Sequence, residues 1–179
     1  MHRVFRIFFI LLILCVAIPL DVVNAANGTV ECDFDEIMGT LYVSGSGTVT
    51  AEDVEPFSKN DVKEIWIGNQ ITGIGASAFC NWTDLHKLSF ERKSHLITIE
   101  QEAFRGTGIE YIVFPETLQI IEERAFYGCG RMELVEFQNE GVMETQIGKE
   151  AFAETPIGIL LFTEELLWVT ALFIIHIHM

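Results

Sequence analysis

The hydrophobic positions of this chain follow a repeating motif, Ile-x-x-x-Ala-Phe, which occurs four times. The copies begin at Ile74, Ile99, Ile121 and Ile147, and their closing Phe residues are 22 to 26 positions apart. Self-similarity at such a period is typical of solenoids, in which each short unit buries its apolar side chains against its neighbours. The sequence therefore predicts a stack of single-strand units rather than a compact enzyme domain, with any function on its surface.

A second pattern, apolar-x-x-apolar-x-apolar, recurs in an independent register. Five segments carry it; they begin at Val62, Leu85, Ile109, Met132 and Ile157, which are 23 to 25 residues apart. Each segment predicts one short parallel strand, because side chains alternate between the two faces of a strand. Its fourth and sixth positions are expected to point into the core, and its second, third and fifth positions outward.

The rest of each unit must return the chain to the start of the next strand. The Ile, Ala and Phe of each motif are expected to point inward, so that each Phe stacks on the Phe of the next repeat at high packing density. The stretch between Ile and Phe predicts a single helical or 3₁₀ turn. The expected fold class is an α/β solenoid, with repeats over residues 62–163.

Residues 26–61 lie before the repeats and have a different pattern. Thr40–Val43 alternates like a strand, Ser44–Gly47 has the composition of a turn, and Thr48–Thr50 returns to β-forming residues. This order predicts a β-hairpin. We expect the hairpin to form an N-terminal cap, because the first repeat would otherwise expose apolar side chains and unpaired strand edges.

The first 25 residues have the features of a secretory signal peptide. Arg3 and Arg6 form a basic start, Ile7–Leu20 is an apolar run without charge, and Val23–Ala25 provides a cleavage site. A short membrane anchor is the weaker alternative, because a span needs about 20 residues. We therefore expect residues 1–25 to be removed and the protein to be secreted or displayed at the cell surface.

The segment 164–179 does not continue the repeats. No further Ile-x-x-x-Ala-Phe follows Phe162, and Leu166–Met179 contains no Asp, Glu, Lys or Arg. Three interpretations stay open: part of a membrane anchor, the signal tail of a lipid anchor, or the abnormal end of a truncated reading frame. The last is favoured, because the run is short for a span and lacks a clear polar spacer.

The formal net charge of −15 narrows the choice of partners. Nucleic acids and anionic membranes reward Lys and Arg, so neither is an expected partner, and a membrane contact is expected only if the tail is an anchor. A soluble acidic surface is the simpler explanation of the charge, and a basic partner is the alternative.

The cysteines give no clear disulfide pattern. Cys15 leaves with the signal peptide, and Cys32, Cys80 and Cys129 remain. Cys80 and Cys129 lie two repeats apart, on the order of 10 Å at the strand spacing of a sheet, which is too far for a disulfide. We expect both to be small buried residues, while a bridge between Cys32 and Cys80 stays open.

Two N-glycosylation sequons occur, Asn27-Gly28-Thr29 and Asn81-Trp82-Thr83. One lies near the new N-terminus and the other in a repeat turn, and both are expected to be exposed. Asn27 and Asn81 are therefore candidate glycan acceptors if the source is eukaryotic.

The strand pattern followed by Ile-Gly-x-x-Ala-Phe resembles the BspA-like, treponemal-type leucine-rich repeat. The segment from Cys32-Asp33-Phe34 to Leu41–Gly45 also resembles the N-terminal cap of that family, and the likeness covers about residues 30–163. The resemblance implies a leucine-rich-repeat stack that is secreted or surface-displayed and serves in adhesion and binding to host matrix proteins. It implies no catalytic residue.

The sequence contains few candidates for catalytic or metal-binding residues. We find no nucleophile motif, phosphate-binding loop or cluster of metal ligands, and His86 and His95 lack a matching acid or thiol pattern, so both are expected to be solvated. His176 and His178 could lie on one face of a strand, which is a weak metal signal in an apolar tail. We expect no enzymatic activity, no metal and no cofactor.

The outward strand positions carry the better candidate for function. Exposed Trp and Tyr are common binding anchors, and a contiguous apolar patch usually marks an interface. The candidate protein-binding residues are Trp66, Lys87, Tyr111, Val113, Leu134 and Glu136. The alternative is that these residues reflect β propensity alone and that the C-terminal half of the face is covered by the tail or by a second copy.

Two functions follow from these observations. The first is an exported leucine-rich-repeat protein that binds another protein through its sheet face, for example a host extracellular matrix protein in adhesion. The second is a structural or self-associating surface-coat module without a specific ligand.

Overall fold

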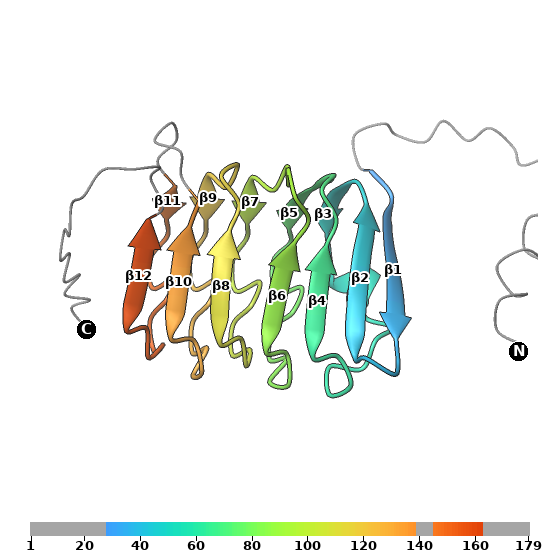
Figure 1. Cartoon of the computed structure of the whole chain (residues 1–179), viewed down its shortest axis with the longest axis horizontal. Helices are drawn as coiled ribbons and strands as arrows, with labels where there is room; N and C mark the ends of the chain where they lie inside the picture. Colours follow the sequence, from blue (N-terminus) through green and yellow to red (C-terminus); the bar gives the residue numbers. More distant parts are fainter. Residues whose placement is uncertain (1–27, 139–144, 163–179) are drawn as a thin grey trace, which may run out of the picture.

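The computed structural model describes residues 28–138 and 145–162, which form a two-sided solenoid (Figure 1). One side is a seven-stranded sheet of β1 (Val30–Asp35), β2 (Thr40–Gly45), β4 (Glu64–Ile67), β6 (Lys87–Phe90), β8 (Tyr111–Phe114), β10 (Leu134–Phe137) and β12 (Ile159–Phe162), in that order. The other side is a five-stranded sheet of β3 (Gly47–Val49), β5 (Ile71–Ile74), β7 (Thr98–Ile99), β9 (Ile120–Ile121) and β11 (Gln146–Ile147). The expected signal peptide, Asn27 and the tail 164–179 lie outside the described residues.

The five predicted strand segments are confirmed as β4, β6, β8, β10 and β12, which pair in parallel. Their fourth and sixth positions face the core, as expected; Ile65, Ile67, Leu88, Ile112, Phe114, Val135 and Phe137 are buried. The last strand differs, since Phe162 at its sixth position is 56% exposed. Among the described strands β12 is the last of this sheet, so within this part of the chain the side chain has a neighbouring strand on one side only.

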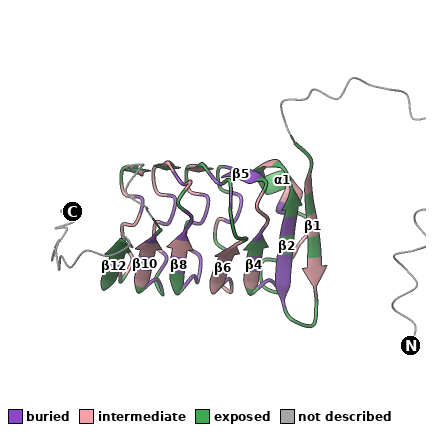
Figure 2. Cartoon of the chain, turned by 45° about the horizontal axis from the view of Figure 1, so that its top comes forward, coloured by how far each residue is buried: buried purple, intermediate pink, exposed green. Residues whose placement is uncertain are grey.

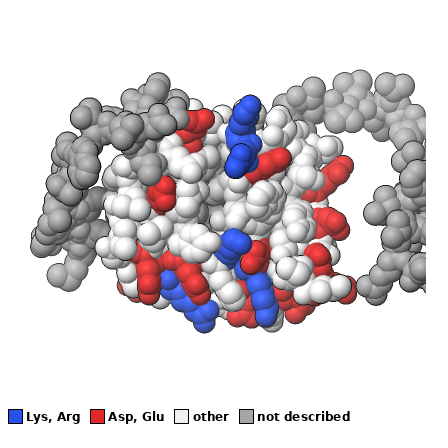
Figure 3. Space-filling view, in the orientation of Figure 1, with Lys and Arg blue, Asp and Glu red and all other residues white. Residues whose placement is uncertain are grey.

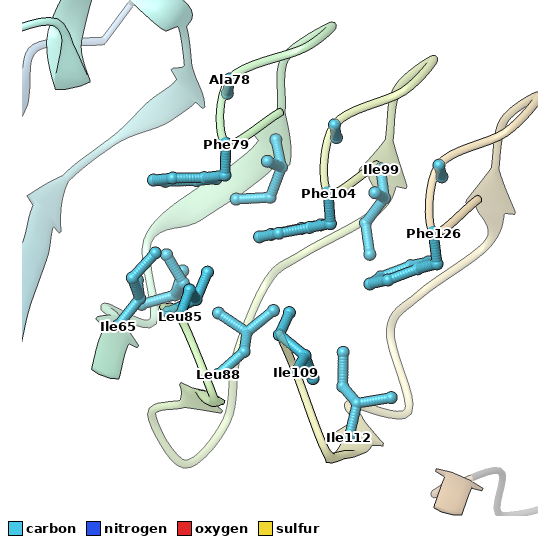
Figure 4. Close-up of a cluster of buried hydrophobic side chains, with 14 of the residues drawn as sticks. Ile65, Ala78, Phe79, Leu85, Leu88, Ile99, Phe104, Ile109, Ile112 and Phe126 are labelled. Carbon is cyan, nitrogen blue, oxygen red and sulfur yellow. The ribbon is translucent and has the colours of Figure 1, made fainter. Parts of the chain in front are cut away.

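The predicted stack of Phe side chains runs along the core (Figure 4). Phe79, Phe104, Phe126 and Phe152 follow one another with ring centroids 5.2 Å apart at every step. The rings are nearly parallel, and the first three are fully buried. Each repeat therefore contributes one ring to a continuous apolar column, which is the packing that the motif predicts.

The prediction of a helical or 3₁₀ turn between the Ile and the Phe of each motif is wrong. The Ile of each motif lies at the end of a short strand of the second sheet, and the residues after it form turns. The residue before each Ala-Phe pair has a φ between 55° and 57°; these residues are Ser77, Glu102, Arg124 and Glu150. A left-handed residue cannot continue a right-handed helix. The fold is therefore a β-solenoid of two parallel-stranded sides rather than an α/β solenoid.

Helix is scarce in this fold. Within residues 28–138 and 145–162, the single helix is the one-turn α1 (Ala51–Val54), and Thr50 and Asp53 close its N-terminus with reciprocal hydrogen bonds. No helix of the described residues is long and apolar enough to span a membrane.

The N-terminal hairpin forms from other strands than those predicted. β1 pairs antiparallel with β2, whereas β3 crosses to the second sheet and pairs in parallel with β5. Gly45 and Gly47 turn the chain between the sheets with φ values of 89° and 99°, a conformation that glycine adopts at little cost. Thr40–Val43 and Thr48–Thr50 are thus not hairpin partners. Figure 2 shows β1, which has no fully buried residue, lying outside the largely buried β2 at this end of the stack.

Candidate protein-binding face

The outer face of the seven-stranded sheet carries two rows of side chains. The first row consists of the third residue of each strand segment: Glu64, Lys87, Tyr111, Leu134 and Ile159. The second row consists of the fifth residue of each segment: Trp66, Ser89, Val113, Glu136 and Leu161. The parallel register places equivalent positions side by side, so the first row is continuous, whereas the second row is in register on each side of the β6–β8 pair, where only Lys87 and Tyr111 are partners. We call this surface the sheet face.

All six predicted binding residues lie on the sheet face, and each is at least partly exposed. Lys87, Tyr111 and Leu134 are neighbours in the first row, and Val113 lies beside Glu136 in the second. Trp66 lies on β4, two strands from Val113 in the second row, and its register partner on β6 is Ser89. Trp66 and Tyr111 are each 43% exposed, so both rings present a large area to solvent.

One residue of this face escaped the sequence analysis. Tyr42 on β2 is the register partner of Trp66 and is 44% exposed, so it extends the aromatic row onto the N-terminal cap. The alternation within Thr40–Val43 was a sufficient signal, because it places Tyr42 on the face opposite the buried Leu41 and Val43.

A pocket of about 360 Å³ opens on the sheet face over β6. Its sides include Trp66 from β4 and Tyr111 and Val113 from β8, and Ser89 lies between them. The loop after β6 supplies Glu91–Ser94 to the rim, and residues following β8 and β10 complete it. The pocket lies beside the β6–β8 pair, which is in register at a single position, Lys87 with Tyr111, and its lining includes the small Ser89.

The charges around this pocket are arranged unevenly. Lys87 donates to Glu64 at 3.1 Å, and this hydrogen bond raises the pKa of Lys87. Arg92 and Lys93 at the rim are exposed and form no ion pair with any residue that the structure describes. Figure 3 shows basic side chains gathered over the middle of the sheet face, near β6.

Two carboxylates also border the pocket, Glu91 and Glu116. The Glu91 carboxylate accepts the backbone N–H of Asn69 at 2.9 Å, which draws it toward the loop after β4. Glu116 lies after β8, on the other side of the pocket from that loop. The basic part of the rim is therefore confined to the loop after β6.

The return turns carry a second group of charges. The guanidinium groups of Arg105 and Arg124 each lie 5.8 Å from the ring centre of Tyr127. Arg124 also contacts Glu150 at 2.6 Å, and this hydrogen bond lowers the pKa of that carboxyl. These residues tie successive repeats together on the side away from the sheet face.

The histidines behave differently from one another. His95 is exposed, as expected, with its Nδ1 2.8 Å from the carbonyl oxygen of Asn69. His86 is only partly exposed, and its Nδ1 is buried without a hydrogen-bond partner, so the expectation of a solvated side chain is wrong for this residue. No group of three or more His, Cys, Asp or Glu residues capable of holding a metal occurs in the described part of the chain. His176 and His178 lie outside that part.

Cys32, Cys80 and Cys129 are free thiols, so the bridge between Cys32 and Cys80 is not formed. Cys129 is buried, as expected, but Cys80 is only partly buried. Burial raises the pKa of Cys32 to about 11, with a further contribution from Asp53, and burial also raises the pKa of Cys80 and Cys129. None of the three is therefore activated as a nucleophile at neutral pH.

The sequon residue Asn81 is exposed in a return turn, at the position where the next two repeats carry glycine. Its φ is 61°, close to the 67° of Gly106 and the 68° of Gly128. Asparagine tolerates this left-handed conformation better than most residues. The backbone alone thus gives a reason for Asn81, and a glycan remains a prediction.

Comparison with known proteins supports the repeat class. A family model described as "BspA type Leucine rich repeat region" matches residues 53–169 with 6 copies. No curated protein matches the chain.

Two solved structures are similar in fold, and a third gives a weaker match. A leucine-rich repeat protein from Eubacterium ventriosum has a TM-score of 0.57 and 18% identity, and the match covers 75% of this chain and 38% of that chain. The T. pallidum leucine-rich repeat protein has a TM-score of 0.56 and 18% identity, over 73% of this chain and 67% of that chain. The pneumococcal vaccine antigen PcpA has a TM-score of 0.48 and 23% identity, over 57% of this chain and 29% of that chain. The chain thus spans less than half the length of two of these proteins.

Proposed function

This chain belongs to the BspA-type leucine-rich repeat family, and from that premise we propose that it is an exported surface protein that binds another protein through its sheet face. The observation that carries the proposal is the set of exposed aromatic rings on one flat surface: Tyr42, Trp66 and Tyr111. Aromatic side chains dominate the energy of many protein interfaces.

The sheet face is well suited to binding because it is rigid. Each of its strands is hydrogen-bonded to its neighbours, and the Phe column beneath it fixes the spacing of the repeats. A partner that docks here loses little free energy to ordering of the protein, which is the advantage of a preorganised surface. Apolar side chains such as Leu134 and Val113 lie beside the aromatic rings and supply further area to bury.

The proposed setting is the outside of a cell, with adhesion to a matrix protein as the activity. Residues 1–25 supply the export signal in this proposal. The acidic character of the chain, at −15, agrees with a protein that must stay soluble outside the cell and does not bind nucleic acid.

Capture by immobilised matrix proteins tests the proposal. The full-length protein is expressed through a secretory pathway and applied to separate surfaces of collagen, fibronectin, laminin and fibrinogen. We expect at least one surface to retain it, and we expect the double substitution Trp66→Ala/Tyr111→Ala to abolish that retention. Tyr127→Ala is the matched control, because it removes an aromatic ring from the return turns instead. Retention that survives the double substitution would exclude the sheet face.

Self-association is the second candidate, and one observation favours it. The last strand of the seven-stranded sheet, β12, exposes three large apolar side chains, Ile159, Leu161 and Phe162. An exposed apolar edge strand is a template for pairing with another chain. Sedimentation of the full-length protein at micromolar concentration separates the two functions, since a surface-coat module forms oligomers there and a ligand-binding monomer does not.

A further inference from the structure

We propose that the pocket over β6 is the specificity subsite of the sheet face and that it receives an acidic segment of the protein partner, with one large apolar side chain beside a carboxylate. This inference rests on the proposed function and adds the chemistry of the partner to it. In the proposed complex the apolar side chain enters between Trp66 and Tyr111, and the carboxylate meets Arg92 and Lys93.

The shape of the pocket limits what it can accept. Its volume of about 360 Å³ lies near the lower end of the range for ligand pockets, about 300–1,000 Å³. It therefore has room for a single large side chain and its neighbours, not for an extended cofactor. Trp66 lies on the β4 side and Tyr111 and Val113 lie on the β8 side, so these three side chains can contact an apolar group, while most of the remaining lining residues are polar.

The charge of the rim gives the second half of the argument. Within the described residues, Lys87, Arg105, Arg124 and Lys149 form ion pairs with carboxylates of this chain. Lys59, Lys63 and Arg131 form none, but they do not line the pocket. Arg92 and Lys93 are adjacent, exposed and unoccupied at the pocket, on a protein whose net charge is −15. Charge-assisted hydrogen bonds from Arg and Lys to a carboxylate are among the stronger polar contacts in proteins. The loop after β6 thus favours an anionic group.

The same surroundings limit how much negative charge the partner can carry. Glu91 and Glu116 line the same pocket and Glu136 lies on the sheet face two strands from β6, so a polyanion placed across this face would meet them. A polyanion gains affinity by neutralising many basic residues, and two are too few. One or two carboxylates directed to the loop after β6 fit this pattern, whereas a nucleic acid or a sulfated polysaccharide does not.

A pair of peptides tests the subsite on the full-length protein. The probe is a dye-labelled, end-blocked nonapeptide of Gly and Ser with a central Phe-Glu, and its partner carries Phe-Gln instead. We expect fluorescence anisotropy to show binding of the Phe-Glu probe at concentrations up to about 1 mM, and about tenfold weaker binding of the Phe-Gln probe, because one charge-assisted contact is lost. Binding of neither probe, or equal binding of both, overturns the proposal.

Variants then assign the two parts of the probe to the two parts of the pocket. Arg92→Ala/Lys93→Ala should weaken the Phe-Glu probe about tenfold and leave the Phe-Gln probe unchanged. Ser89→Leu should weaken both probes, because it fills the pocket. Lys59→Ala/Lys63→Ala is the matched control, since it removes the same charge from residues outside the pocket. An equal loss of affinity for the Phe-Glu probe in this control would show that the effect depends on net charge alone, and it would refute the subsite.

The tests of the subsite and the tests of the proposed function can fail independently. Matrix-protein capture that depends on Trp66 and Tyr111 but not on Arg92 and Lys93 would refute the acidic subsite and leave the binding face intact. Capture that is indifferent to Trp66 and Tyr111 would refute both. Binding of heparin in place of the Phe-Glu probe would show that the basic pair serves a polyanion and would likewise overturn the proposal.

Discussion

The Phe column makes a sharp prediction about stability, because its members are chemically identical and differ in position. Phe104 is fully buried, and its ring lies between those of Phe79 and Phe126, 5.2 Å from each. Phe104→Ala removes a buried ring and leaves a cavity, which costs about 3–5 kcal/mol. The loss should fall in the upper half of that range, because two aromatic contacts are lost, each of about 0.5–1.5 kcal/mol.

Phe162 lies outside the Phe column and provides a partly exposed comparison. It is 56% exposed, and within the described residues its ring stacks on that of Phe137 at 5.4 Å. Truncation of a half-exposed ring leaves no closed cavity, so we expect Phe162→Ala to cost roughly 1 kcal/mol. The difference between the two variants combines the loss of burial with the loss of stacking on both sides, and the second of these is the nearest-neighbour coupling of a solenoid.

Urea unfolding followed by far-UV circular dichroism measures both losses. Domains of this kind are stable by about 5–15 kcal/mol, so Phe104→Ala should lower the midpoint strongly. If this variant does not fold, Phe104→Leu keeps much of the volume and should still cost more than Phe162→Ala. Equal losses at the two positions would refute the idea that the column is the main apolar support of the stack.

Three further predictions concern single side chains. Ser77→Gly should raise the stability by about 0.5–1 kcal/mol, because its φ is 55°, whereas Ser89→Gly within β6 should lower it by a similar amount; thermal unfolding gives both signs. Burial raises the pKa of the Cys129 thiol, so the folded protein keeps this thiol protonated at a pH where the unfolded chain loses the proton. The stability contributed by the buried thiol is therefore complete below the unfolded thiol pKa of about 8.5 and is lost as pH rises through the pKa of the folded state. The urea midpoint should therefore fall between pH 7.5 and 10, and less so in Cys129→Ala. Asn81 should carry a glycan after secretion from a eukaryotic cell, and Thr83→Ala, which leaves Asn81 in place, should abolish the mass shift on glycosidase treatment; an unmodified Asn81 in the parent protein would contradict this.

The strands could be predicted because every repeat uses the same positions for the same purpose. Ile65, Ile112 and Val135 occupy one inward position in three repeats, and all are buried. A pattern that returns in two independent registers reflects stacking and leaves little room for another fold. The Phe column follows from the same argument, since equivalent residues must lie side by side in a stack.

The returns could not be predicted in this way because their decisive feature is not tied to one residue type. A positive φ is usually marked by Gly or Asn. Here the left-handed position before Ala-Phe is filled by Ser77, Glu102, Arg124 and Glu150 in turn. The spacing between the Ile and the Phe of each motif fits one helical turn, but the left-handed residue gives the backbone a different turn. The prediction of the N-terminal hairpin was wrong for a related reason, because alternation of apolar and polar residues identifies a strand but not the strand with which it pairs.

The binding face was predictable as a surface, but its centre was not. Strand alternation placed Trp66 and Tyr111 outward, and the structure places both there. The pocket between them departs from the pattern, since it lies where β6 and β8 are in register at one position only, and its lining includes the small Ser89 together with Arg92 and Lys93 from the loop that follows. In a solenoid the periodic positions are fixed by stacking, which every repeat needs equally. A small residue at an outward strand position improves neither packing nor β propensity. Stability therefore gives no reason for Ser89, and the proposed acidic subsite supplies one.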